Sequence, residues 1–282
     1  MSKIIALVDG SIYSESVCDH AAWIATRKGS SVEVLHVLGR REGGSQNLSG
    51  NLGLGARTKL MEELAELDEK KSKLNIQRGR AILEDAEARL RTDGVKEVET
   101  RLRNGDLMEE LHAVEEDADL VVIGKRGEAA DFARLHLGSN VERAVRTSKK
   151  PVLVTSRAFR PIETFLIAYD GGKSAIKAVE HVAKSKVFAG LKCKMIFAGV
   201  DSPDNRKILE QGKAILTQAG YEVDAQIIDE QPEIAILETI EMEDIDMLMM
   251  GAYSHSRIRS LFIGSTTSEM IRACLVPLLM FR

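Results

Sequence analysis

The chain has 282 residues, a formal net charge of −4 and a sequence pI near 6.0, so its overall charge does not favour nucleic acid or an anionic membrane as a partner. No apolar stretch approaches the ~20 residues that a transmembrane helix needs, and the amino terminus lacks a signal-peptide core, so we expect a globular cytoplasmic protein. Its three cysteines are scattered and form no C-x-x-C pair, which favours reduced, buried thiols.

In the first half, short apolar runs alternate with segments of helical periodicity. The runs predict strands at 4–8, 32–38, 95–102, 120–123 and 152–154. Helices are predicted over 17–25, closed by Gly29, over 107–114 and over 141–145. A further helical region begins at Leu60 and either continues or breaks before Leu90. Strands that alternate with helices predict a parallel sheet covered on both faces.

The second half repeats this order of elements. Strands are predicted at 165–169, 194–200, 221–228, 247–250 and 277–280, with helices over 176–183, 208–216, 234–240 and 268–273. This half is shorter because it lacks a glycine-rich insertion at about 39–56. We expect that insertion to be a mobile surface loop, and the alternative is a lid over a site at the carboxyl ends of the strands.

Matching segments in the same order show that the chain is a duplication. Residues 116–120 align with 243–247, the loop from Gly124 aligns with the loop from Gly251, and Val8-Asp9-Gly10-Ser11 aligns with Tyr169-Asp170-Gly171-Gly172. A fixed order of matching elements over half a chain each indicates two similar domains. The predicted fold class is therefore α/β, with two tandem domains at 1–157 and 158–282, each an open five-stranded parallel sheet with helices on both faces.

Three features of the chain resemble the universal stress protein family. They are an aspartate at the end of the first strand, a Leu35-His36-Val37 type of end to the second, and a G-x-x-G then G-S loop after the fourth. The resemblance covers essentially the whole chain in the fused, tandem form of the family. It implies a Rossmann-like, adenine-nucleotide α-hydrolase-like fold that binds ATP, with Mg²⁺ on the phosphates and no metal ligands of its own.

The resemblance also implies the roles of individual residues. Asp9 and Asp170 would approach the adenine, beside the backbone of Val37 and Val200. Four residues would lie near the ribose and phosphates, namely Gly124, Gly127, Gly251 and Ser254. Two loop ends would bind the phosphate chain through backbone N–H groups and hydroxyls, which suits glycine and a helix amino end; they are Gly138-Ser139-Asn140 and Gly264-Ser265-Thr266.

Both copies depart from the family spacing of Gly, two residues, Gly, nine residues, Gly and then Ser or Thr. The first half has ten residues, 128–137, where nine are expected, and in the second half Ser254 replaces the second glycine. These departures leave open which half binds nucleotide more tightly. A simpler alternative is that Asp9 and Asp170 are helix N-caps and that the Gly-Ser pairs are ordinary helix starts. Basic loop residues such as Lys125 could pair with phosphates, although such charges usually face water.

Other nucleotide and catalytic motifs are excluded. Gly171-Gly172-Lys173-Ser174 resembles the end of a P-loop, but Ile167 stands where that motif needs its first glycine. No base is paired with an activated nucleophile, so we expect a binding protein and not a dedicated enzyme.

The leading hypothesis is a nucleotide-responsive regulator in stress response, with an unknown regulatory protein partner. The alternatives are a slow ATPase or nucleotidyl transferase, and an interaction scaffold whose degenerate pockets bind another small metabolite. The resemblance further implies that the two halves pair through their fifth strands into an intramolecular pseudo-dimer, and that the whole chain could form a homodimer.

Overall fold

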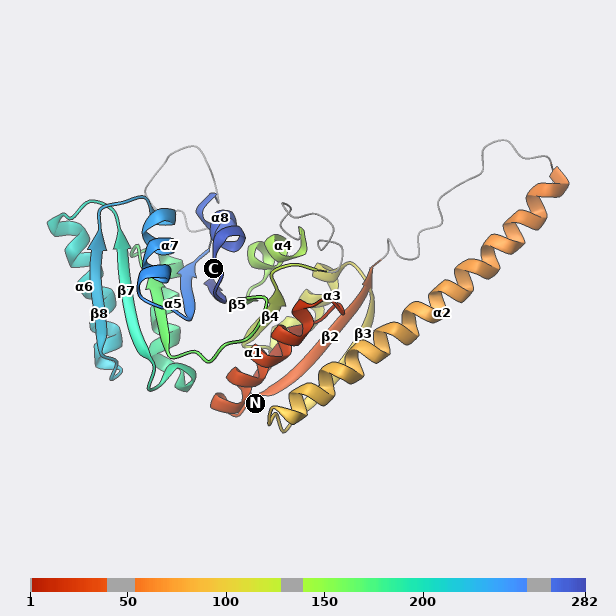
Figure 1. Cartoon of the computed structure of the whole chain (residues 1–282), viewed down its shortest axis with the longest axis horizontal. Helices are drawn as coiled ribbons and strands as arrows, with labels where there is room; N and C mark the ends of the chain where they lie inside the picture. Colours follow the sequence, from red (N-terminus) through yellow and green to blue (C-terminus); the bar gives the residue numbers. More distant parts are fainter. Residues whose placement is uncertain (1, 40–53, 128–138, 253–264) are drawn as a thin grey trace.

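The computed structural model describes residues 2–39, 54–127, 139–252 and 265–282 (Figure 1). The elements of the first half are β1 (Lys3–Leu7), α1 (Tyr13–Lys28), β2 (Ser31–Gly39), α2 (Leu54–Thr92), β3 (Val98–Gly105), α3 (Leu107–Val114), β4 (Leu120–Gly124), α4 (Ser139–Thr147) and β5 (Val152–Thr155). A short 3₁₀ turn, η2 (Glu115–Asp117), follows α3.

The second half contains β6 (Thr164–Ala168), α5 (Lys173–Lys184), the 3₁₀ turn η4 (Lys186–Phe188), β7 (Lys192–Ala198), α6 (Pro203–Gln218), β8 (Val223–Ile228), α7 (Pro232–Met242), β9 (Met247–Gly251), α8 (Ser265–Ala273) and β10 (Leu278–Phe281). The order of strands and helices agrees with the sequence prediction in both halves. Residues 40–53 of the predicted insertion lie outside the described residues, and its last part, 54–56, belongs to the first turn of α2 and not to a loop.

The ten strands of the described residues form a single sheet in the order β3-β2-β1-β4-β5-β10-β9-β6-β7-β8. Within each half all neighbouring strands are parallel, whereas β5 and β10 are antiparallel, with Leu279 opposite Leu153. The predicted α/β class is thus confirmed, and the halves join through their fifth strands. The predicted boundary between 157 and 158 falls in the connection from β5 to β6 and stays a prediction.

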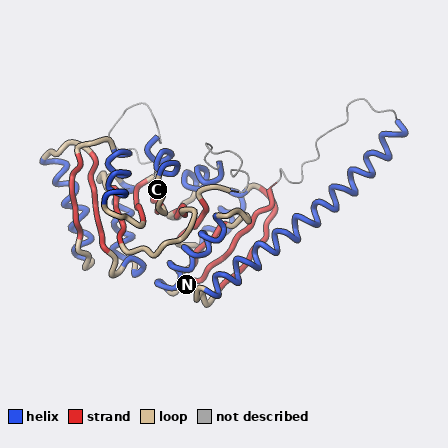
Figure 2. The backbone as a smooth tube through the Cα atoms, viewed as in Figure 1, coloured by secondary structure: helices blue, strands red, loops and turns tan. Residues whose placement is uncertain are grey.

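Helices cover both faces of the sheet (Figure 2), and the strand pattern explains why. Along β1 the fully buried side chains alternate, so that Ile4 and Ala6 join one apolar cluster while Ile5 and Leu7 join the other. Helices α1 and α2 pack on the first cluster and α3 and α4 on the second. Both clusters also contain residues of the second half, so the two halves share a continuous core.

Direct contacts outside the sheet also join the halves. Arg27 at the end of α1 donates from Nε to the carbonyl of Val187 at 2.5 Å and from Nη2 to that of Ala189 at 2.7 Å. Trp23 lies one helical turn earlier, with its ring centroid 6.3 Å from that of Phe188. A side chain of the first half therefore satisfies backbone carbonyls of the second, which favours a fixed arrangement of the two.

Local contacts decide one boundary that differs from the prediction and one question that the sequence leaves open. Strand β3 begins at Val98 and not at Val95, because Gly94 (φ 92°) and Val95 close α2 by donating their N–H groups to the carbonyls of Arg91 and Leu90. Helix α2 continues without a break through Gly79, where a Cβ would lie 2.8 Å from Leu102 Cδ1. A larger residue there would displace the Leu102 side chain, because the helix packs closely on the sheet.

All three cysteines are free and buried, as the sequence predicts. Burial raises the pKa of the Cys18 thiol to about 12 and that of Cys193 to about 12, and it also raises the pKa of Cys274. Because the thiolate is the reactive form, we expect fewer than one thiol per chain to react quickly with Ellman's reagent in the folded protein. All three should react after denaturation, and fast native reaction of any one would contradict the buried placement.

Candidate functional site

The candidate site of the first half lies where the strand order reverses, between β1 and β4. Leu7 is the last paired residue of β1 and lies opposite Ile123 of β4, so Asp9 and Gly124 follow at the carboxyl ends of adjacent strands. From here the chain crosses to β2 and β3 on one side and to β5 on the other. Such a switch point is where open α/β sheets bind ligands. The second half places Asp170 and Gly251 in the same way.

Asp9 is held in a tight turn in front of α1. Its Oδ1 accepts a hydrogen bond from the backbone N–H of Ser11 at 3.0 Å and one from the Ser14 hydroxyl at 3.3 Å. The Ser14 oxygen in turn accepts the backbone N–H of Gly10 at 3.0 Å. Since the residue in the N-cap position of α1 is Ile12, the alternative in which Asp9 caps the helix is wrong.

Asp170 makes a simpler turn in the second half. Its Oδ1 accepts the backbone N–H of Gly172 at 2.8 Å, and Gly172 itself is the N-cap of α5, so Asp170 is not the cap either. The residue that matches Ser14 is Ala175, which has no hydroxyl to support the carboxylate. Asp170 is exposed, whereas Asp9 is partly buried. The first half therefore fixes its aspartate more firmly.

The glycine after each aspartate has a structural role. Gly10 and Gly171 adopt left-handed conformations, with φ of 78° and 71°. A Cβ on Gly10 would lie 2.7 Å from Ile82 Cδ1 of α2, and one on Gly171 would lie 2.5 Å from Ile208 Cγ2 of α6. The glycine of each Asp-Gly pair thus permits both a left-handed turn and close packing of a helix.

The loop after β4 crosses directly over the aspartate. A Cβ on Gly127 would lie 2.7 Å from Asp9 Oδ2, so a larger residue there would push the carboxylate out of its present position. Position 124 favours glycine for a different reason, because a Cβ there would lie 2.7 Å from Tyr13 Cβ at the start of α1. Gly251 meets Ser174 in the equivalent way, at 2.9 Å. Of these three glycines, only Gly127 faces the aspartate of the candidate site.

The end of β2 supplies backbone groups beside Asp9. The N–H of Val8 donates to the carbonyl of Leu35 at 3.1 Å, and the backbone groups of Val37, two residues on, point to the same side past the end of β1. In the second half Tyr169 donates to Ile196 at 2.9 Å, so the positional counterpart of Val37 is Ala198.

Val200 is therefore not the counterpart that the sequence suggested. It lies two residues beyond β7, its side chain is 64 % exposed, and its carbonyl accepts a hydrogen bond from Asn205 Nδ2 at 2.8 Å. The prediction placed it in the strand because β7 was expected to run to residue 200. The chain leaves the strand at Gly199, which has a φ of 142°.

The predicted phosphate-binding ends open the expected helices. Ser139 and Asn140 are the first two residues of α4, and Ser265 and Thr266 are the first two of α8. Gly138, Ser254 and Gly264 lie outside the described residues. The Thr266 hydroxyl donates to Glu233 Oε1 at 2.5 Å, so in the second half a carboxylate lies beside the oxygen that was expected to meet phosphate.

The matching carboxylate of the first half, Asp106, is paired with an arginine. Asp106 is the N-cap of α3 and accepts the backbone N–H of Met108 at 2.9 Å. Arg143 of α4 donates from Nη2 to the same oxygen at 2.8 Å, and this pairing holds the pKa of Asp106 below its ordinary value. The residue at the equivalent position of α8 is Glu269. No local sequence pattern predicts this difference, although Asp106 followed by Glu109 is a capping-box signal for the start of α3.

Lys125 does not point at the candidate site of its own half. Its Nζ donates to the carbonyl of Cys274 at 2.6 Å, at the end of α8 in the second half, and burial lowers the pKa of the amine. Because β5 and β10 are antiparallel, the carboxyl end of β4 lies near the amino end of β10 at the junction. The side chain serves the contact between halves.

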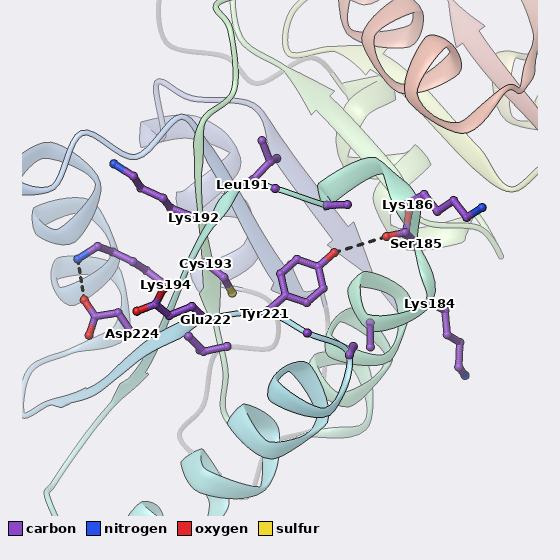
Figure 3. Close-up of a pocket in the computed structure, with 16 residues that line it drawn as sticks. Lys184, Ser185, Lys186, Leu191, Lys192, Cys193, Lys194, Tyr221, Glu222 and Asp224 are labelled. Atoms are coloured by element: carbon purple, nitrogen blue, oxygen red, sulfur yellow. Dashed lines mark hydrogen bonds and ion pairs between the residues drawn. The ribbon is translucent and has the colours of Figure 1, made fainter.

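The described residues also form an open hollow of about 1030 Å³ in the second half (Figure 3). It lies at the amino ends of β7 and β8, where Tyr221 donates to the carbonyl of Val182 at 3.3 Å, and thus at the opposite end of the strands from Asp170. Lysines on its wall are partly paired, as Lys194 is with Asp224 at 2.9 Å. This hollow is separate from the candidate nucleotide site.

The described residues contain no group of three or more His, Cys, Asp or Glu side chains arranged to hold a metal ion. None of the helices in the described ranges is both long enough and apolar enough to cross a bilayer.

These features define a tandem α/β protein with a candidate ligand site at a sheet switch point in each half. The sequence profile of the universal stress protein family matches residues 1–156 and 161–282, so the chain belongs to that family. It is 37 % identical over its full length to the universal stress protein Slr1230 of Synechocystis, all of which is covered. It is also 30 % identical to the universal stress protein MJ0577 of Methanocaldococcus jannaschii, over 55 % of this chain and 94 % of that protein.

Solved structures show the same fold. The crystal structure of a universal stress protein from Archaeoglobus fulgidus superposes with a TM-score of 0.69 at 21 % identity, over 99 % of this chain and 96 % of the other.

Proposed function

We propose that this universal stress protein binds ATP at the switch point of its first half, and that the bound nucleotide regulates its association with a protein partner. The observation that carries the proposal is the close approach of Gly127 to the Asp9 carboxylate, where a Cβ would fill the space 2.7 Å from Oδ2. Val37 lies near the carboxyl end of β2, two residues beyond the Leu35 carbonyl that pairs with Val8. A fixed acceptor beside the backbone N–H and C=O groups of Val37 suits the donor and acceptor edge of an adenine.

The residues present fit the parts of the nucleotide. Asp9 would accept the adenine amino group, and the amino end of α4, from Ser139, would receive the phosphates through backbone N–H groups and the helix dipole. Mg²⁺ would accompany the ATP on its phosphate oxygens. We propose binding without a dedicated catalytic cycle, in the cytoplasm, where reduced thiols such as Cys18 persist.

The test is a calorimetric titration of nucleotide-stripped protein with ATP and Mg²⁺. We expect saturable binding dominated by one site per chain, with ATP recovered unchanged afterwards. Gly127→Ala should weaken binding about 10- to 100-fold, because the added methyl group displaces a charged acceptor worth ~1.5–3 kcal/mol. Its melting temperature without nucleotide is the control for folding. Absence of binding to the wild-type protein would overturn the proposal, and turnover of ATP would make the protein an enzyme instead.

A further inference from the structure

The amino-terminal part of α2 extends beyond the body of the protein (Figure 1). The helix has 39 residues and is therefore about 58 Å long. Its carboxyl-terminal part packs on the sheet through Leu83, Ala86 and Leu90, all of which are buried. Residues 60–78 are mostly exposed, and we refer to them as the outer segment of α2. Their counterparts are absent from α6, which has only 16 residues.

The outer segment carries an apolar stripe. Leu60, Leu67 and Leu74 are spaced by seven residues, with exposed fractions of 36 %, 60 % and 63 %. Leu64 lies between the first two on the same face and is half-buried. This is the alternating four- and three-residue spacing of the a and d positions of a coiled coil, in which leucine at d packs against a facing helix. Large apolar side chains repeated in this register are typical of a helix with a helical partner.

The charges of the outer segment change sign along its length. The acidic residues lie in the first part, namely Glu62, Glu63, Glu66, Asp68 and Glu69. The basic residues follow, namely Lys70, Lys71, Lys73 and Arg78, with no acidic residue among them. A parallel second copy would place acidic against acidic and Lys71 against Lys71 in the seam. An antiparallel second copy places the acidic part against the basic part in both directions.

We propose that the outer segment of α2 is a dimerisation surface, on which a second copy of the chain packs its own outer segment in the antiparallel direction. Leu64 of one copy then lies near Leu74 of the other, twice by symmetry. Leu67 packs on the aliphatic stem of Lys71 from the other copy, and the amine of that lysine reaches Asp68, the neighbour of Leu67 in the first copy. The charge inversion selects a second copy over an unrelated apolar partner because the segment is its own electrostatic complement.

The mass of the full chain in solution tests this surface. We expect sedimentation equilibrium to show a species of twice 31.0 kDa at micromolar concentrations. Leu67→Glu with Leu74→Glu should raise the dimer dissociation constant by at least about 100-fold, since four carboxylates enter the seam of each dimer. Both leucines are exposed in the single chain, so the melting temperature at low concentration should not fall. Met242→Glu, at a side chain 78 % exposed on α7, is the matched control and should leave the mass unchanged.

Disulfide trapping tests the direction of packing. Glu63→Cys and Gln77→Cys are prepared separately, and the native cysteines stay silent because they are buried. Antiparallel packing predicts a crosslinked dimer only when the two variants are mixed under oxidation, because residue 63 of one copy then lies near residue 77 of the other. Crosslinking of Glu63→Cys with itself would overturn the antiparallel arrangement. A monomer at all concentrations, or a dimer unaffected by the double leucine variant, would overturn the proposal altogether.

Discussion

Asp9→Ala is expected to remove most of the ATP binding of the chain, whereas Asp170→Ala is expected to leave it nearly unchanged. Asp9 is fixed by the N–H of Ser11 and the hydroxyl of Ser14, so its carboxylate needs little rearrangement to accept a ligand hydrogen bond. Loss of a charged acceptor costs ~1.5–3 kcal/mol, which corresponds to about a 10- to 100-fold weaker Kd.

The second half is expected to bind weakly because of its charges. The Thr266 hydroxyl is already donated to Glu233, so a phosphate at this helix end would meet a carboxylate. Two like charges ~5 Å apart repel by roughly 2–3 kcal/mol at an effective dielectric constant of ~20–40, or about 30- to 100-fold in affinity. In the first half Arg143 pairs with Asp106 and removes this penalty.

Calorimetric titration of the two aspartate variants, side by side with the wild-type protein, measures this ranking. Glu233→Gln combined with Glu269→Arg should bring the second half closer to the charge pattern of the first and add a second binding event. Equal losses in both aspartate variants would show that the halves bind alike and that the charges at α7 and α8 do not matter.

The fold was accessible from the sequence because it depends on local periodicity. Strands such as Leu120–Gly124 and helices such as Leu107–Val114 are predicted by the pattern of apolar residues within the segment itself, and the duplication supplies each pattern twice. The boundary errors arose where a cap or a close contact decides. Val95 reads as a strand residue by composition, but the left-handed Gly94 turns it into part of the helix end.

The candidate site was accessible only in part. The order of Asp9, Gly124 and Gly127 along the chain predicted one edge of the sheet, and the structure brings Asp9 and Gly127 into contact. The sequence could not predict why an individual position is a glycine. At Gly124, for example, the close contact is with Tyr13, which lies more than a hundred residues away in the chain. The pairs Asp106–Arg143 and Glu233–Thr266 join different helices, and no local pattern records which charges meet across them.

Leu279→Ala is expected to destabilise both halves of the protein together, by about 2–5 kcal/mol. Leu279 is 2 % exposed in β10, lies opposite Leu153 of β5, and belongs to the apolar cluster that crosses the junction. A cavity there removes packing from the strands of both halves at once. The matched control is Leu275→Ala at a side chain 85 % exposed, which should change stability by no more than ~0.5 kcal/mol.

Denaturant unfolding followed by two probes measures this coupling. Trp23, the single tryptophan, belongs to the first half and lies against Phe188 of the second, and far-UV circular dichroism reports the helices of both. We expect the two transitions to coincide and to shift together in Leu279→Ala. A shift confined to one of two separate transitions would mean that the halves fold independently. If they unfold as one unit, ATP at 100 times its Kd adds ~2.7 kcal/mol to the stability of the whole chain, so occupancy of the first half is felt in the second.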